Sequence, residues 1–140
     1  MKSSVAVLII GACVAAAAEP QDSRSVWDGV YTAEQAARGR ALYFTHCANC
    51  HGQQLEGADT APALTGSAFT ADWDGLTVGD LFDRIRVTMP ANRPGSLPRP
   101  EIADVLAFML GANQFPSGDT ELPREVQVLK QIQFKAEKPK

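Results

Sequence analysis

Apolar residues recur at helical spacing in three segments of the chain. Thr32 begins a capping-box pattern followed by good helix formers, which predicts a helix over 33–45. Thr77 is a second capping residue and predicts a helix over 78–87, and a proline at the first turn opens a third helix over about 100–112. Each segment has an apolar stripe on one face. The pattern therefore predicts an all-α fold with three main helices.

The segments between these helices show no sustained period. Residues 52–72 are rich in Gly, Pro, Thr, Ser and Asp, and residues 89–98 contain three prolines, so both are expected to be loops. One further helical turn or two is expected around 125–132. Because three helices with such long loops can bury little core by themselves, the loops are expected to wrap around something.

The first residues have the pattern of an export signal. Lys2 is followed by an uncharged apolar run over 5–15 and by small alanines before Glu19, which predicts a signal peptide over 1–18. The run is shorter than the roughly 20 residues that span a bilayer. A buried N-terminal helix is the alternative.

Cys13 lies alone inside this predicted signal. The sequence Ile10-Gly11-Ala12-Cys13 resembles a lipoprotein cleavage box, in which the cysteine is lipidated and would anchor the chain to a membrane. The alternative, which the shortness of the apolar stretch favours, is that Cys13 is discarded with the signal. The remaining chain divides into a lead-in over 19–31, a main domain over 32–116 and a C-terminal extension over 117–140.

Composition is that of a globular protein, with 45% hydrophobic and 21% charged residues. The net charge is −3, and no run of Lys or Arg precedes the last few residues, so nucleic acid is excluded as a partner. The acidic balance predicts a partner with a basic docking face. Aromatic residues make up only 7%, and a large planar cofactor could supply part of the core.

The motif Cys47-Ala48-Asn49-Cys50-His51 carries the candidate chemistry. Cys-x-x-Cys-His is the attachment signature of c-type haem. Two thiols three positions apart can each bond one vinyl group of the same porphyrin, and His51 is then held under the ring, where its imidazole reaches the iron. The motif predicts one covalently attached haem c.

Two thiols at this spacing have three other interpretations. A structural zinc site needs four ligands, and besides the thiols the chain offers only His46 and His51, which lie too close together. A dithiol redox motif expects a βαβ neighbourhood, which is missing from the pattern. A plain disulfide in an exported protein would leave His51 without a role.

A closed electron-transfer haem needs a second axial ligand. Met89 stands in an irregular loop before Pro90 and is the preferred candidate. Met109 falls within the apolar stripe of the third helix, so it is expected in the core. His46 lies on the tethered side of the haem and is expected to be an exposed polar side chain.

Residues 32–113 resemble the class I, mitochondrial-type cytochrome c family. The resemblance depends on the shared order of several features with the haem motif, which are Gly39, Tyr43, Ala61-Pro62-Ala63-Leu64, Trp73, Thr88-Met89-Pro90 and Phe108. It implies that the Pro62 carbonyl accepts a hydrogen bond from His51, that Leu64 and Trp73 belong to the haem surroundings, with Trp73 near a propionate, and that Phe108 crosses Gly39.

The flanking segments narrow this resemblance. Residues 26–31 and 113–116 are similar to periplasmic cytochromes like the c domains of quinoprotein (PQQ-dependent) alcohol and sugar dehydrogenases. The resemblance implies a periplasmic single-electron carrier between such a dehydrogenase and a respiratory chain, through a terminal oxidase or another cytochrome. Two alternatives stay open, a haem subunit of a dehydrogenase complex and a haem enzyme or sensor with an open iron position. A colourless disulfide or interaction module is a third.

Overall fold

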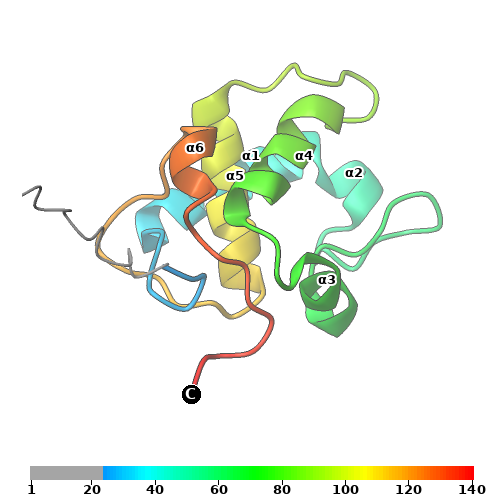
Figure 1. The fold of residues 1–140 in the computed structure, drawn as a ribbon. Coiled ribbons are helices and arrows are strands. Elements are labelled where there is room, and N and C mark those ends of the chain that lie inside the picture. Colours follow the sequence, from blue (N-terminus) through cyan, green and yellow to red (C-terminus); the bar gives the residue numbers. More distant parts are fainter. Residues whose placement is uncertain (1–23) are drawn as a thin grey trace, which may run out of the picture.

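The computed structural model describes residues 24–140, and the predicted signal peptide with Cys13 lies outside them. Six helices lie in this range, which are α1 (Ala33–His46), α2 (Ala48–His51), α3 (Gly66–Trp73), α4 (Val78–Thr88), α5 (Arg99–Ala112) and α6 (Val126–Leu129) (Figure 1). The all-α prediction is confirmed, because the described residues contain only isolated β-bridges and no strand. The three predicted main helices are α1, α4 and α5, and the turn predicted near the end is α6.

Helices α1 and α5 make the principal packing contact of the fold. They meet where Gly39 faces the backbone of α5, so closely that a Cβ on Gly39 would lie 1.8 Å from the carbonyl oxygen of Asp104. A glycine inside a helix costs about 1 kcal/mol relative to Ala, and this close backbone approach is the packing reason for having one here. Phe108, which the resemblance placed across Gly39, lies one turn beyond Asp104 on α5 and packs its ring against Tyr43, with ring centroids 5.3 Å apart.

The prediction of a loop throughout 52–72 is wrong in its last part, where α3 begins. Gly66 has a φ of +90°, which lets the chain turn sharply into this helix after Thr65. Phe69 is the buried residue of α3, and its ring lies 6.2 Å from that of Phe134. A tertiary contact with a residue 65 positions later thus stabilises a helix that local composition does not favour.

The two ends of the described chain run side by side. Gln133 forms bridges to both Ser25 and Thr77, so the C-terminal segment lies between the N-terminal segment and the α3–α4 connection. The Val26 amide donates to the Gln133 carbonyl at 3.0 Å, and the Val78 amide donates to the Ile132 carbonyl at 2.9 Å. Residues 24–31 and 117–134 therefore pack into the same core as the main domain.

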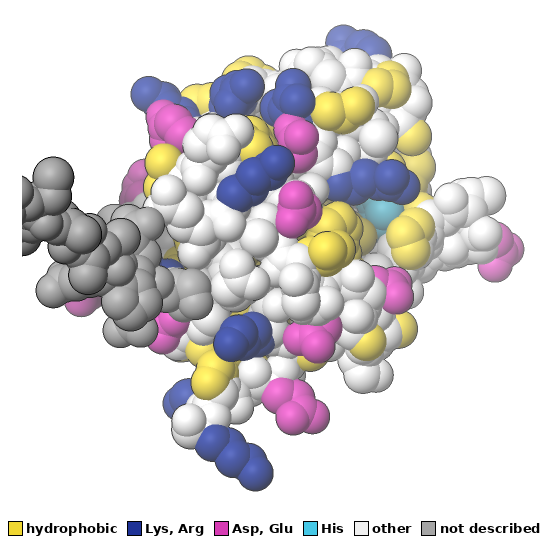
Figure 2. Space-filling model, viewed as in Figure 1, with side chains coloured by type: hydrophobic (Ala, Val, Ile, Leu, Met, Phe, Trp, Pro, Cys, Tyr) yellow, Lys and Arg dark blue, Asp and Glu magenta, His cyan; other side chains and the backbone are white. Residues whose placement is uncertain are grey.

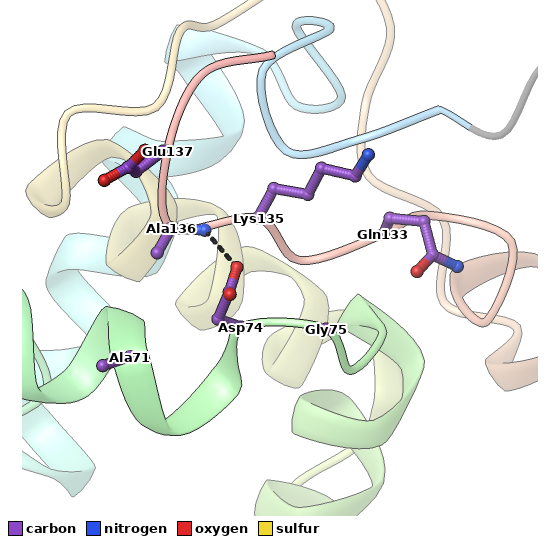
Figure 3. A pocket seen from close by; sticks show the side chains of 7 residues that line it. All are labelled: Ala71, Asp74, Gly75, Gln133, Lys135, Ala136 and Glu137. Carbon is purple, nitrogen blue, oxygen red and sulfur yellow. Dashed lines mark hydrogen bonds between the residues drawn. The ribbon is translucent and has the colours of Figure 1, made fainter.

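Phe134 is the centre of an aromatic cluster beneath this segment. Its ring lies 5.3 Å from Phe115 and 6.2 Å from Phe69, and Phe115 in turn lies 4.9 Å from Trp27. Beyond Phe134 the chain crosses the end of α3, where the Ala136 amide donates to the Asp74 carboxylate at 2.8 Å (Figure 3). The C-terminal extension is thus attached to the core through Phe134 and to the residue after α3 through Ala136.

None of the helices in the described residues has the length and apolar character needed to cross a membrane.

The α1–α5 crossing generates the first prediction. We expect Gly39→Ala to lower the free energy of unfolding by about 1–3 kcal/mol, because the new methyl group must push two backbones apart. Helix propensity alone would change it by about 1 kcal/mol in the opposite direction. Denaturant unfolding followed by circular dichroism measures the change.

The matched control is Ala37→Gly, at an exposed position of the same helix. It should destabilise by about 1 kcal/mol through propensity alone. A Gly39→Ala variant more stable than the parent protein would contradict the close approach.

Candidate functional site

The two thiols of the motif lie on one helical turn directly after α1. The Cys47 amide donates to the Tyr43 carbonyl at 2.8 Å, and the amides of Cys50 and His51 both donate to the Cys47 carbonyl at 3.1 and 3.0 Å. This arrangement continues the chain from α1 into α2 with almost no linker. Both cysteines are free thiols; Cys47 is half-buried and Cys50 is exposed. The turn therefore presents two thiols and an imidazole from five consecutive residues.

Burial sets the protonation state of the first thiol. Removal from water, with a smaller contribution from the nearby Cys50 thiol, raises the pKa of Cys47 to about 11. Dithiol redox motifs depend instead on a lowered thiol pKa, which produces the reactive thiolate. The environment of Cys47 thus argues against the dithiol interpretation.

His51 is held with one ring nitrogen occupied. Its side chain is 8% exposed, and Nδ1 lies 2.8 Å from the Pro62 carbonyl oxygen. Because a carbonyl can only accept a hydrogen bond, Nδ1 must donate, and in the neutral imidazole Nε2 is then the nitrogen that can bind a metal. The contact that the resemblance implies is present, whereas iron ligation by His51 remains a prediction.

Gly57 makes this contact geometrically possible, and sequence reasoning missed it. Its φ is +78°, and a Cβ there would lie 2.5 Å from the Ala63 amide nitrogen and 2.8 Å from the Pro62 carbonyl carbon. The Gly57 amide also donates to the His51 carbonyl at 2.8 Å. The loop can fold back on His51 only because Gly57 has no side chain. The signal was a single glycine in a glycine-rich loop, which local composition cannot distinguish from its neighbours.

Asn113 is a second residue that sequence reasoning missed. It follows the last residue of α5, and its Nδ2 donates to the Leu64 carbonyl at 2.9 Å while its Oδ1 accepts from the Gly66 amide at 3.1 Å. One side chain thereby joins the end of α5 to the segment between Pro62 and α3. A polar residue directly after an apolar stripe was the available signal, but it is also the common pattern of an ordinary helix end.

Tyr43 fixes the other side of the motif. Its hydroxyl donates to the Gly52 carbonyl at 2.6 Å, directly after His51. Burial, with smaller contributions from Cys47 and Glu56, raises the pKa of Tyr43 to about 12, so the phenol stays protonated and keeps donating. Tyr43 thus clamps the turn against α1, a role that the resemblance did not specify.

Met89 and Met109 occupy different environments. Met109 is 2% exposed within the core face of α5, as predicted, so its thioether has no open side. Met89 caps the end of α4, donating its amide to the Ile85 carbonyl at 2.9 Å and accepting from the Gly95 amide at 3.3 Å. Its side chain is half-buried. His46, expected to be exposed, is also half-buried, in the last turn of α1.

The start of α4 is fixed as firmly as its end. Thr77 and Asp80 form a reciprocal capping box, in which the Asp80 carboxylate accepts from the Thr77 amide at 2.9 Å and hydroxyl at 2.6 Å. The Thr77 hydroxyl, and less strongly its amide, lowers the pKa of Asp80. Because α4 leads directly to Met89, this cap contributes to the placement of the candidate distal ligand.

Four apolar side chains of the candidate site are left partly exposed, as side chains that line a large planar group would be. Leu64 and Trp73 lie at the margin of the core and are only half-buried. Ile85, four residues before Met89, and Leu97, eight residues after it, are half-buried as well. Two thiols, an imidazole and a thioether are the donors that bind haem c. In residues 24–140, no three His, Cys, Asp or Glu side chains gather as a metal site, so the four-ligand shell of structural zinc is not assembled there.

Comparison with known proteins agrees with this chemistry. Residues 34–109 match the family model described as cytochrome c oxidase, cbb3-type, subunit III. A chain in the crystal structure of the sulfane dehydrogenase SoxCD from Paracoccus pantotrophus is similar in fold, with a TM-score of 0.54 and 24% identity. The similarity covers 86% of this chain and 67% of the other. No curated protein matches.

The capping box of α4 generates the second prediction. The pKa of Asp80 in the folded protein lies below its ordinary value of 3.8, so the cap contributes its full stability above that value. This contribution is lost as the pH falls through the folded-state pKa. We expect Asp80→Ala to lower the free energy of unfolding by about 1 kcal/mol at neutral pH, and the difference to shrink in acid.

Denaturant titrations between about pH 7 and pH 2.5 measure both effects, and the window spans the ordinary pKa of an aspartate. Asp72→Ala, at an exposed position of α3, is the control and should change stability by less than about 0.5 kcal/mol. An Asp80→Ala deficit that grows as the pH falls would contradict the assigned direction.

Proposed function

The chain belongs to the family of cytochrome c oxidase cbb3-type subunit III, and from this membership we propose that it carries single electrons on one covalent haem c, with His51 and Met89 as axial ligands. The cytochrome c domain makes haem-based electron transfer its general function. The number of haems, their ligands, the partners and the location are parts of the proposal. The observation that carries it is the His51–Pro62 hydrogen bond beside two free thiols on one turn.

The proximal side of the proposal depends on how His51 is presented. The Pro62 carbonyl holds Nδ1, so Nε2 would be the nitrogen that binds the iron. Cys47 and Cys50, on the same turn, would hold the porphyrin by two thioether bonds. Leu64 and Trp73 would line the ring, with Trp73 near a propionate.

The distal side depends on elimination between two thioethers. Met109 is enclosed in the core, whereas Met89 is half-buried at the end of a helix whose two ends are both fixed. The bound haem supplies an iron that changes between ferrous and ferric states, and thioether ligation favours the ferrous state. Met89 would also close the position to other ligands, which favours an electron carrier over a haem enzyme or sensor.

We propose further that the chain is exported to the periplasm by its N-terminal signal. There it would accept electrons from a dehydrogenase of the PQQ-dependent class and pass them to a terminal oxidase or another cytochrome of a respiratory chain. The sequence resemblance of the flanking segments supports this role. Lipidation of Cys13 would add a membrane anchor.

Covalent attachment generates the third prediction. When the protein is expressed with a working haem-attachment system, its denatured mass should exceed the chain mass by one haem. Cys47→Ala or Cys50→Ala should leave one thioether bond and a lower yield. His51→Ala should largely prevent maturation, because the proximal ligand is lost. Mass spectrometry of the unfolded protein measures each outcome, and an unmodified mass for the parent chain would contradict covalent haem.

Distal ligation generates the fourth prediction. Met89→Ala should abolish the sulfur-to-ferric-iron charge-transfer band, lower the potential and let the reduced protein bind carbon monoxide. Met109→Ala is the matched control. It should keep the band and exclude carbon monoxide, but cost about 2–5 kcal/mol of stability, because it opens a cavity in the core.

Optical spectra, potentiometry and thermal unfolding of the two variants separate these phenotypes. If the parent protein itself binds carbon monoxide rapidly and exchanges no electrons with a dehydrogenase in stopped flow, the carrier proposal fails and only the haem assignment remains. If Met109→Ala abolishes the charge-transfer band and Met89→Ala keeps it, Met109 is the distal ligand and the assignment of Met89 is wrong.

A further inference from the structure

The chain is acidic overall, yet its charge changes sign around Met89. Residues 84–99 contain four of the 13 basic residues and none of the 16 acidic ones. They are Arg84, Arg86, Arg93 and Arg99. All other residues together carry a clear acidic excess. The net charge predicted a partner with a basic docking face, but partners respond to the charge of the surface that they approach.

Three of these four guanidinium groups are available to a partner. Arg86 is engaged by Asp83, with Nε and Nη2 each 2.8 Å from Oδ1. Arg84, Arg93 and Arg99 are exposed and form no ion pair within the described residues. We call these three residues with the intervening loop the arginine face. This surface extends from the end of α4 along the loop to the start of α5, across the upper part of the view in Figure 1.

The loop that carries this face is internally ordered. The Arg93 amide donates to the Pro90 carbonyl at 2.8 Å, and the Gly95 amide returns to the Met89 carbonyl at 3.3 Å. These two hydrogen bonds therefore hold the backbone of Arg93 in a short ordered loop next to Met89. A charge held at this place acts on whatever approaches the distal side of the proposed haem.

Exposed apolar surface adjoins the arginines. Val87, two residues before Met89, is 55% exposed, the most exposed large hydrophobic side chain of the described residues. The prolines at 94 and 98 are exposed as well. Figure 2 shows Lys and Arg side chains over the upper part of the molecule, with apolar side chains, some Asp and Glu side chains and a histidine among them. An apolar centre with a charged border is the composition of a protein-docking patch.

We infer that the arginine face is the docking surface for an electron-transfer protein whose own contact face is rich in Asp and Glu. The inference rests on the proposed function, since it supplies the partner side of the same site. Guanidinium groups pair with carboxylates in a bidentate manner and steer encounter over a distance set by the salt concentration. The redox contact itself is expected to be small and short-lived.

Oxidation of the ferrous, haem-loaded protein by ferricyanide tests the local charge. The double variant Arg84→Gln/Arg93→Gln and the control Lys138→Gln/Lys140→Gln remove the same charge, the second from the opposite end of the view in Figure 1. At about 10 mM salt the loop variant should react about threefold or more slowly, and the control should stay near the parent rate. At about 150 mM salt, where the Debye length falls from about 30 Å to about 8 Å, the difference should narrow.

Two outcomes of this experiment overturn the inference. Equal slowing by both variants would show that only net charge matters, and an unchanged rate in the loop variant would show that electrons leave elsewhere. In either case the carrier proposal stands, because the protein still exchanges electrons. Failure of the parent protein to react with ferricyanide would overturn the proposed function itself.

A macromolecular probe then identifies the kind of partner. Polyaspartate should inhibit ferricyanide oxidation of the parent and of the lysine variant, but much less that of the arginine variant. Vesicles of phosphatidylglycerol are the competing probe for an anionic lipid surface. If the vesicles bind in an arginine-dependent way and polyaspartate does not inhibit, the face meets a membrane and the inference of a protein partner is wrong.

Discussion

The hydrogen bond between His51 Nδ1 and the Pro62 carbonyl is the contact on which the site depends. It joins two segments eleven residues apart, and it exists only because the intervening loop folds back on itself. Gly57 permits that fold by having no Cβ, and the Leu64 amide closes the loop on the Leu55 carbonyl at 2.8 Å. The orientation of the His51 imidazole is thus set by the fold of the whole loop. For this reason the imidazole can be held rigidly although its helix, α2, is a single short turn.

The same loop is tied to the helix pair that forms the core. Asn113 holds the segment after Pro62 to the end of α5, and Tyr43 holds the residue after His51 to α1. Because α1 and α5 cross at Gly39 with their backbones in contact, the hydrogen bonds of Asn113 and Tyr43 both attach the site to one rigid pair of helices. The geometry of the thiols and the imidazole is therefore determined by packing far from the motif itself.

Features encoded by short-range pattern could be predicted from the sequence, and features that depend on distant partners could not. The main helices follow from capping residues and 3.6-residue periodicity, so α1, α4 and α5 were found. Helix α3 depends on Phe69 packing against Phe134, and no local rule contains that contact. At the site, the Cys-x-x-Cys-His motif could be recognised in the sequence because its spacing is fixed. Gly57 and Asn113 could not, because they act through contacts with backbone groups of other segments. Core placement of Met109 followed from its stripe.

The C-terminal extension has a consequence for the distal side of the site. Its backbone binds the start of α4 through the Ile132 carbonyl, and Gly79 packs so closely on it that a Cβ would lie 2.6 Å from the Lys130 amide nitrogen. Helix α4 is a rigid rod of 11 residues, so fixing its first turn fixes where its last turn delivers Met89. The candidate proximal ligand is positioned by a loop that directly follows the Cys-x-x-Cys-His motif, but the candidate distal ligand is positioned by Lys130 and Ile132, which lie 41 and 43 positions beyond it. The extension is for this reason part of the site's architecture.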